Sequence, residues 1–257
     1  MTATEESGGT SRAPAEQELP GGFPQLKKPA KRKVPRYARW TKIERDLRAE
    51  KGPMLAGVDE VGRGPIAGPV VACAVIMPPD KPAIRGVDDS KKLTAKERVK
   101  LAEKIRTHAI AYALGAASVR EIERLNIYQA SALAMHRALS RLKIPPDHVV
   151  IDGKTMRSLP VPHTAVVHGD ARCFSIACAS ILAKVCRDEL MTRLAVRHPG
   201  YAWERNAGYT VPEHIAGLSA HGITVHDRRS FVRVSQLTFD FSPEVLIADT
   251  LDQVLPA

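Results

Sequence analysis

The stretch MLAGVDEVGRGPIAGPVVACAVIM, residues 54–77, contains two apolar runs separated by a glycine-rich segment. Residues 54–61 and 69–77 each have the length of a buried strand. Asp59 and Glu60 end the first run, and neighbouring carboxylates there offer a divalent cation a place to bind. Because successive side chains of a strand point to opposite faces, one acid must act from the strand end, or the chain must bend at the glycines.

The segment Gly62-Arg63-Gly64 follows the paired acids directly. Glycine has no Cβ atom, so the backbone here can approach a ligand closely. Arginine forms forked hydrogen bonds with phosphate, which lysine cannot copy. Acids and turn together indicate metal-dependent chemistry on a phosphate backbone.

Beyond this stretch, helical and strand patterns alternate along the chain. The patterns predict strands over 110–117, 148–151 and 164–168, and helices over 40–50, 94–108, 120–142 with a break near Asn126, 174–197, and after Pro212. A capping box of Thr94 and Glu97 marks the start of the second of these helices. Such an order is typical of an α/β fold: a mixed β-sheet flanked by helices, with a helical C-terminal part.

Two more acids share the context of Asp59. Asp152 ends a predicted strand and precedes a glycine, and Asp170 follows another strand and a glycine. Strand ends are where reaction centres gather in α/β proteins, and several carboxylates meeting there need a neutralising cation. Oxygen ligands fit Mg²⁺ or Mn²⁺ rather than zinc. An Asp-Gly pair is also a common turn, and that alternative stays open for each acid alone.

The composition restricts the class of protein. The 257 residues fit one large domain with tails, and the formal net charge of +10 favours a polyanion such as nucleic acid. A basic protein without such a partner is the alternative. The sequence has no apolar segment that could span a membrane and no signal-peptide core, so a location in the reducing cytoplasm is expected. A monomer is the default expectation for the oligomeric state.

The ends of the chain differ from its middle. Residues 1–50 are expected to form a disordered basic N-terminal extension, apart from the short helix near its end. Residues 51–236 form the predicted catalytic domain, and residues 237–257 a C-terminal extension without a clear role. Residues 27–39 carry seven basic residues and no acid. They either stay solvated or bind phosphates without specificity.

Several long blocks carry a resemblance to a known family. They are AGVDEVGRGPIAGPVV (56–71), VDDSKKLT (87–94), NIYQASALAM (126–135), VVIDGK (149–154), GDARCFSIACASILAKVCRDELM (169–191), HPGYAWERNAGYTVPEHIAGLSAHG (198–222) and HDRRSF (226–231). In order and spacing these blocks resemble bacterial ribonuclease HII, the type 2 branch of ribonuclease H. The resemblance implies a ribonuclease H-like fold. It also implies cleavage of RNA in RNA/DNA hybrids and incision 5′ of single ribonucleotides embedded in duplex DNA.

The resemblance also implies roles for individual residues. Asp59, Glu60 and Asp152 match the family's metal-binding acids, and Asp170 its fourth active-site carboxylate. One ion would be held by Asp59, Asp152 and Asp170 and a second by Asp59 and Glu60, giving 5′-phosphate and 3′-hydroxyl ends.

Substrate contacts are implied by the same resemblance. Gly62, Arg63 and Gly64 match the motif that reads the 2′-hydroxyl and its neighbouring phosphate, and Tyr209 matches a tyrosine that stacks on the sugar. An ordinary half-buried tyrosine is the alternative for Tyr209. Further matches near the substrate backbone are Lys91, Lys92, Asn126 and Gln129.

Two other functions compete with this interpretation. A DNA nuclease of the same superfamily would share the clustered acids but has no need to read a 2′-hydroxyl. A non-catalytic nucleic-acid-binding protein would explain the charge but not acids at a phosphate site.

Overall fold

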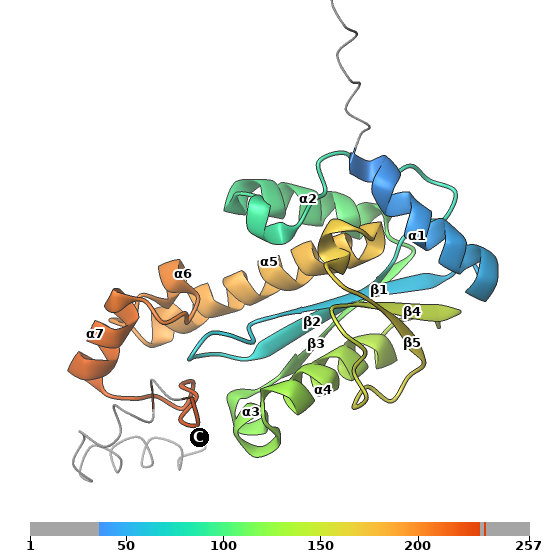
Figure 1. Cartoon of the computed structure of the whole chain (residues 1–257). Coiled ribbons are helices and arrows are strands. Elements are labelled where there is room, and N and C mark those ends of the chain that lie inside the picture. Colours follow the sequence, from blue (N-terminus) through green and yellow to red (C-terminus); the bar gives the residue numbers. More distant parts are fainter. Residues whose placement is uncertain (1–35, 232–233, 235–257) are drawn as a thin grey trace, which may run out of the picture. The chain divides into compact units, whose positions relative to one another are not determined.

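The computed structural model of the protein describes residues 36–231 and residue 234. A five-stranded sheet lies at the centre of this part of the chain (Figure 1). Its strands are β1 (Leu55–Val61), β2 (Val70–Ile76), β3 (Ala111–Ala117), β4 (His148–Asp152) and β5 (His163–Val166), in the order β3-β2-β1-β4-β5. β1 pairs antiparallel with β2, and β2 with β3, whereas β1–β4 and β4–β5 are parallel pairs. The predicted mixed sheet is confirmed.

Helices surround this sheet. They are α1 (Arg36–Lys51), α2 (Ala95–His108), α3 (Val119–Leu125), α4 (Ile127–Ser140), α5 (Phe174–Arg197), α6 (Trp203–Asn206) and α7 (Pro212–His221), with 3₁₀ turns η1 (Ser90–Lys92) and η2 (Gly169–Ala171). The capping box of Thr94 and Glu97 starts α2 as predicted. The predicted break at Asn126 separates α3 from α4, with φ of 68° at this residue. α5 has the predicted bounds.

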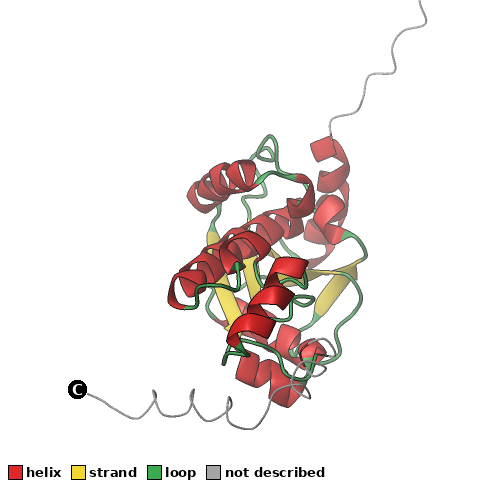
Figure 2. Cartoon of the chain, turned by 90° about the vertical axis from the view of Figure 1, so that its left-hand side faces the viewer, coloured by secondary structure: helices red, strands yellow, loops and turns green. Residues whose placement is uncertain are grey.

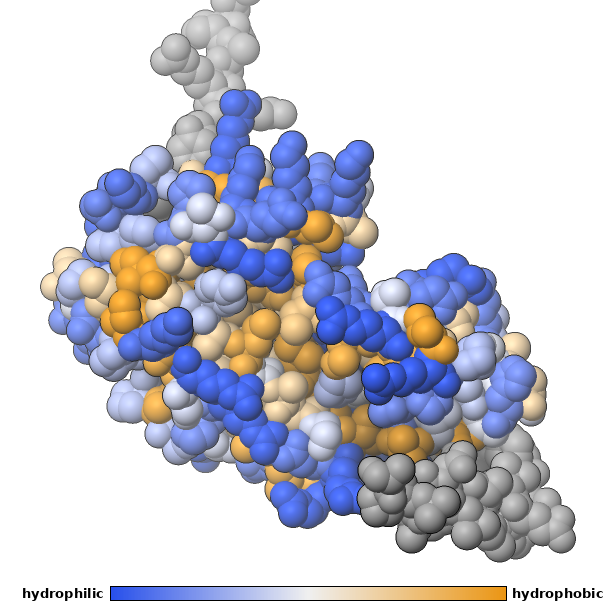
Figure 3. All heavy atoms as spheres, turned by 180° about the vertical axis from the view of Figure 1, so that it is seen from behind, coloured by the Kyte–Doolittle hydropathy of each residue, from blue (hydrophilic) through white to orange (hydrophobic). Residues whose placement is uncertain are grey.

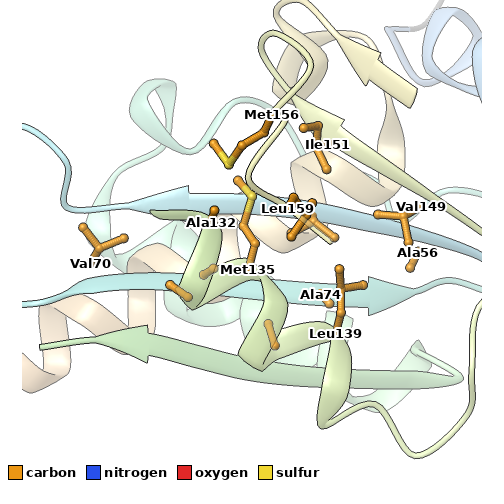
Figure 4. Packing of buried hydrophobic residues seen from close by; sticks show 14 of the residues in the cluster. Ala56, Val70, Ala74, Ala132, Met135, Leu139, Val149, Ile151, Met156 and Leu159 are labelled. Atoms are coloured by element: carbon orange, nitrogen blue, oxygen red, sulfur yellow. The ribbon is translucent and has the colours of Figure 1, made fainter. Parts of the chain in front are cut away.

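One face of the sheet is covered by α4. Met135 and Leu139 of α4 point toward Ala56 and Ala74 of the strands, among other buried apolar residues (Figure 4). The opposite face packs against α5 and α2. Gly57 is required where α5 crosses β1, because a Cβ atom there would overlap the backbone of Ser175. Two apolar layers therefore fix the strand ends that carry the acids.

α1 packs onto the outer part of this core. Ile43 and Leu47 contact a buried cluster that includes Leu55 and Ile176. Residues 36–50, most of this helix, belong to the segment expected as a disordered extension, so the folded part begins earlier than residue 51. The predicted helix over 40–50 lies within α1. Residues 1–35 and 235–257, which hold the rest of both expected extensions, lie outside the described residues.

The C-terminal part is helical, as expected. α5 continues past the sheet toward α6 and α7 (Figures 1 and 2). In this part, Trp203, Tyr201 and Leu218 belong to a further buried cluster. Ile66 and Ala67 of the β1–β2 connection belong to the same cluster. The connection is thereby held between the sheet and the C-terminal helices.

The surface seen from behind Figure 1 is mostly hydrophilic, with hydrophobic residues scattered between charged ones (Figure 3). Among the described helices, none combines the length and apolar character needed to cross a membrane.

Candidate active site

The parallel pairing of β1 with β4 stops just before two of the acids. The last parallel pair between β1 and β4 is Val58 with Ile151. Asp59 and Asp152 are the next residues on the two strands, so they lie next to each other. The structure therefore brings these two acids together, as expected from their positions at the ends of apolar runs.

Glu60 joins them although it follows Asp59 in the same strand. Beyond Val58, β1 is paired with β2 alone, and its other edge is open. Both acids line one cavity of about 260 Å³. The structure therefore brings these two consecutive side chains to a single site.

The cavity combines carboxylates, the glycine-rich turn and polar residues of η1 and α5. Its lining consists of Asp59, Glu60, Val61, Gly62, Arg63, Gly64, Ser90, Lys91, Asp152, Ser180, Lys184 and Tyr209.

Asp59 is the most deeply placed acid of the cavity. Its carboxylate accepts a hydrogen bond from the Glu60 N–H at 2.8 Å, and Ser180 of α5 lies beside it. Burial first, and then the charges of Glu60 and Asp152, raise its pKa well above the usual range. An uncompensated negative charge is thus unfavourable at this position.

Glu60 has a cation beside it. Nη1 of Arg63 lies 3.1 Å from its Oε1. Burial nevertheless raises the pKa of Glu60, with a further contribution from Asp152, while Arg63 acts in the opposite direction. The arginine compensates the buried charge only in part.

Asp170 lies on η2, close to the end of β4. The N–H of Gly169 donates to Oδ1 of Asp152 at 2.6 Å, which ties η2 to the strand end. Asp170 is buried, and its pKa is raised by burial first and then by Asp152 and Asp89. It does not line the cavity itself, but Nζ of Lys91, which does, lies 3.8 Å from its Oδ2.

Four further residues were expected near the substrate backbone, and the structure places only one of them at the cavity. Lys91 lines the cavity, and although burial lowers its pKa, the surrounding carboxylates raise it overall. Lys92 instead approaches Asp88 at 3.5 Å. Asn126 caps α4 by accepting hydrogen bonds from backbone N–H groups, and Gln129 lines a different cavity. Lys92, Asn126 and Gln129 are therefore not brought to the carboxylates.

The glycine-rich turn borders the acids on one side and Tyr209 on the other. Gly62 has φ of +95°, and a Cβ atom there would overlap Arg187, so only glycine fits. A Cβ atom on Gly64 would lie 3.9 Å from Cε1 of Tyr209. The Tyr209 side chain is 41% exposed and borders the cavity. The turn and the tyrosine lie together, as the resemblance implied.

Several polar residues at the site were not predicted. Ser180 is hydrogen-bonded to Ser90 at 2.8 Å, and Lys184 forms an ion pair with Asp188. Arg187 and Arg228 are fully buried beneath the turn. Ser180 and Lys184 lie four residues apart on the predicted helix that comes after Asp170. This spacing places them on one helix face and could have indicated that they lie near the acids. The arginines carry no comparable signal, because arginine is almost always exposed.

The donor set suits a hard divalent cation. All four acids offer oxygen, and the pKa values of Asp59, Glu60 and Asp170 are raised by burial and by neighbouring carboxylates, whose negative charge a cation would neutralise. Within the described part of the chain, no three His, Cys, Asp or Glu side chains are already grouped closely enough to hold an ion. The site therefore fits a cation by its chemistry and charge, with the carboxylates spread around the cavity.

Comparisons with known proteins identify the family of the chain. The sequence model of ribonuclease HII matches residues 56–238. Ribonuclease HII of Gluconobacter oxydans is 52% identical over 194 residues, covering 74% of this chain and 94% of that protein. Ribonuclease HII of Paracoccus denitrificans is 55% identical over 185 residues, covering 71% and 87%.

Among solved structures, ribonuclease H2 from Pyrococcus horikoshii superimposes with a TM-score of 0.64 at 26% identity. The match covers 72% of this chain and 97% of that one. It confirms the ribonuclease H-like fold. Since the family model spans well over half of the sequence, the chain belongs to the ribonuclease HII family of ribonuclease H hydrolases, which cleave the RNA of RNA/DNA hybrids.

Proposed function

We propose that this protein hydrolyses the RNA strand of RNA/DNA hybrids and also incises duplex DNA 5′ of single embedded ribonucleotides. One observation supports this best: the carboxylates share a cavity with a glycine-rich turn and an exposed tyrosine. Acids alone suit any nuclease of the superfamily. A neighbouring ribose-reading surface favours the enzyme that distinguishes RNA from DNA.

The acids are the proposed holders of Mg²⁺ or Mn²⁺. Asp59, Asp152 and Asp170 would hold one ion, and Asp59 with Glu60 a second. Divalent metal supplies a water of lowered pKa and neutralises charge on the leaving 3′-oxygen. The protein's own contribution is to hold Asp59, Glu60 and Asp152 around one cavity, with Asp170 beside Asp152. The proposed products are 5′-phosphate and 3′-hydroxyl ends.

Ribose recognition is assigned to the turn. Only the 2′-hydroxyl distinguishes RNA from DNA at a single nucleotide, and backbone amides of Gly62–Gly64 can reach it without a Cβ atom in the way. Arg63 would bind the adjacent phosphate, exchanging its contact with Glu60 for one with substrate. Tyr209 offers an aromatic face to the sugar.

Lysines at the cavity complete the proposed phosphate contacts. The Lys91 side chain is 83% exposed, and nearby carboxylates keep it protonated. It is therefore a cation available to a phosphate. Contacts of Lys92, Asn126 and Gln129 with a longer duplex stay predictions, as do a monomeric state and a cytoplasmic location.

A cleavage assay tests the proposed function. A labelled DNA duplex with one ribonucleotide is incubated with Mg²⁺, with Mn²⁺ and with EDTA, beside an all-DNA duplex of the same sequence. We expect a metal-dependent nick on the 5′ side of the ribonucleotide and no cut in the all-DNA duplex. Equal cleavage of both duplexes would contradict the assignment of ribose recognition.

A further inference from the structure

Arg228 lies beneath the glycine-rich turn, far from it in sequence. Its side chain is completely buried. Nη2 donates to the carbonyl oxygen of Gly62 at 2.5 Å, Nη1 to that of Arg63 at 3.0 Å, and Nε and Nη2 to that of Gly68 at 3.0 and 2.7 Å. One guanidinium thus binds three carbonyls of a single connection.

These contacts determine where the amides of the turn point. The described chain has no cis peptide bond, so each C=O and the following N–H lie on opposite sides of their peptide unit. The carbonyls of Gly62 and Arg63 point toward Arg228. The N–H groups of Arg63 and Gly64 therefore point away from it. Within residues 36–231, neither N–H has an acceptor.

The arrangement needs arginine. Burial of a charged group is unfavourable unless its hydrogen-bonding capacity is used, and here the guanidinium nitrogens donate to three carbonyl oxygens of the β1–β2 connection. The guanidinium fork reaches several carbonyls in a fixed plane, whereas an ammonium is a point charge on a flexible stem. The ring of Phe231, 5.1 Å from the Arg228 Cζ, adds a cation–π contact.

Arg187 supports the same connection through other carbonyls. It donates to the carbonyl oxygens of Ala67, Pro69 and Ala207 at 2.9–3.0 Å. Ala207 precedes Tyr209 by two residues, so Arg187 joins the connection to the tyrosine segment. It does not bind Gly62 or Arg63, whose carbonyls are held by Arg228.

We propose that Arg228 is a positioning residue for ribose recognition, which holds the N–H groups of Arg63 and Gly64 toward the 2′-hydroxyl and its phosphate. The inference rests on the proposed function. It adds a specificity-determining residue that touches no substrate atom and acts through backbone carbonyls.

The test compares binding of two duplexes by full-length protein carrying Asp59→Asn, which keeps the substrate intact, with Mg²⁺ present. The measured quantity is the Kd for an all-DNA duplex divided by the Kd for the same duplex with one ribonucleotide. Adding Arg228→Lys should lower this ratio about 10-fold, the value of one well-aligned hydrogen bond, with the all-DNA Kd unchanged. A ratio equal to that of the parent overturns the proposal.

A matched control separates positioning from stability. Arg137 also forks onto Glu121 and the Ala116 carbonyl, but it lies on α4, away from the turn. Arg137→Lys should lower the melting temperature and leave the ratio unchanged. If the parent protein itself binds both duplexes equally, the proposed function fails rather than the role of Arg228.

A measurement without substitution covers the case in which Arg228→Lys does not fold. ¹⁵N relaxation of the unsubstituted protein should show the amides of Arg63 and Gly64 as rigid as those of α5. Rapid motion of these two amides, with α5 rigid, overturns the proposal.

Discussion

The backbone N–H of Gly169 donates to Oδ1 of Asp152 across 2.6 Å, and this bond joins the end of β4 to the turn that carries Asp170. The two acids are separated by 18 positions in sequence, from residue 152 to residue 170, yet they are placed by one contact. A Cβ atom on Gly169 would overlap Ile176 of α5 and lie 3.2 Å from the same oxygen. The glycine therefore permits the acids to approach.

Replacing Asp59 by asparagine should abolish cleavage while leaving duplex binding largely intact. The asparagine side chain has nearly the same size but lacks the charge needed for a divalent cation. We expect kcat to fall by at least about 100-fold, a typical loss when charge stabilisation at a reaction centre is removed. Single-turnover cleavage and fluorescence anisotropy measure the two properties. Normal turnover by this variant would exclude the proposed metal role.

The unfolding free energy of the metal-free protein should depend on pH through Asp59. Burial and mutual repulsion raise the folded-state pKa of Asp59, so the folded protein holds a proton that the unfolded chain has released. The contribution of this group is therefore fully present below about pH 4, its unfolded pKa, and is lost as pH rises through the folded value.

Asp59→Asn removes that loss. In EDTA, the unfolding free energy of the Asp59→Asn variant should exceed that of the wild type by an amount that grows between about pH 4 and pH 8. This difference should shrink when Mg²⁺ is added. Urea denaturation across this range gives both curves. A difference independent of pH and of metal would contradict the unfavourable charge.

The two glycines of the turn should respond differently to alanine. Gly62→Ala meets Arg187 at a positive φ and should destabilise the protein by about 1–3 kcal/mol. Gly64→Ala places its methyl at ordinary contact distance from Tyr209, so stability should stay within about 0.5 kcal/mol of wild type. Its methyl group enters the cavity, and cleavage at a single ribonucleotide should weaken. Urea denaturation and the cleavage assay together distinguish the two positions.

We expect His214 to have a structural role, in which it holds the backbone at Tyr209. Its Nε2 accepts a hydrogen bond from Nε1 of Trp203 at 2.9 Å, which leaves Nδ1 as the donor to the Tyr209 carbonyl at 3.0 Å. His214→Ala leaves both partners unsatisfied and should lower the unfolding free energy by about 2–5 kcal/mol. His221→Ala, on the same helix but at its exposed end, is the control and should change stability less. Equal losses for both variants would contradict this assignment.

Much of the fold follows from local patterns. The long apolar helix α5 and the capped helix α2 were predicted because their periodicity and caps lie within the elements themselves. α6 was not predicted, because it is flanked by Ala202 and Ala207 with φ of 55° and 48°, a conformation that alanine rarely adopts. Packing around Trp203, rather than local propensity, sets that segment.

The site, like the fold, could be predicted only in part from the sequence. Strand-end acids can be predicted, since hydrophobic runs show where strands end. The open edge beside Glu60 could not, because it depends on where β4 stops relative to β1. Arg187 and Arg228 could not either, since their burial arises from tertiary contacts.

α5 serves both halves of the cavity. Ser180 lies beside Asp59, and seven residues further along the same face Arg187 donates to carbonyl oxygens of the β1–β2 connection and of the segment before Tyr209. At about 1.5 Å per residue these anchors are roughly 10 Å apart along the helix axis. One helix thus fixes the spacing between the acids and the turn. Under the proposed ribose recognition, this spacing would limit which phosphodiester, counted from the recognised sugar, can be cut.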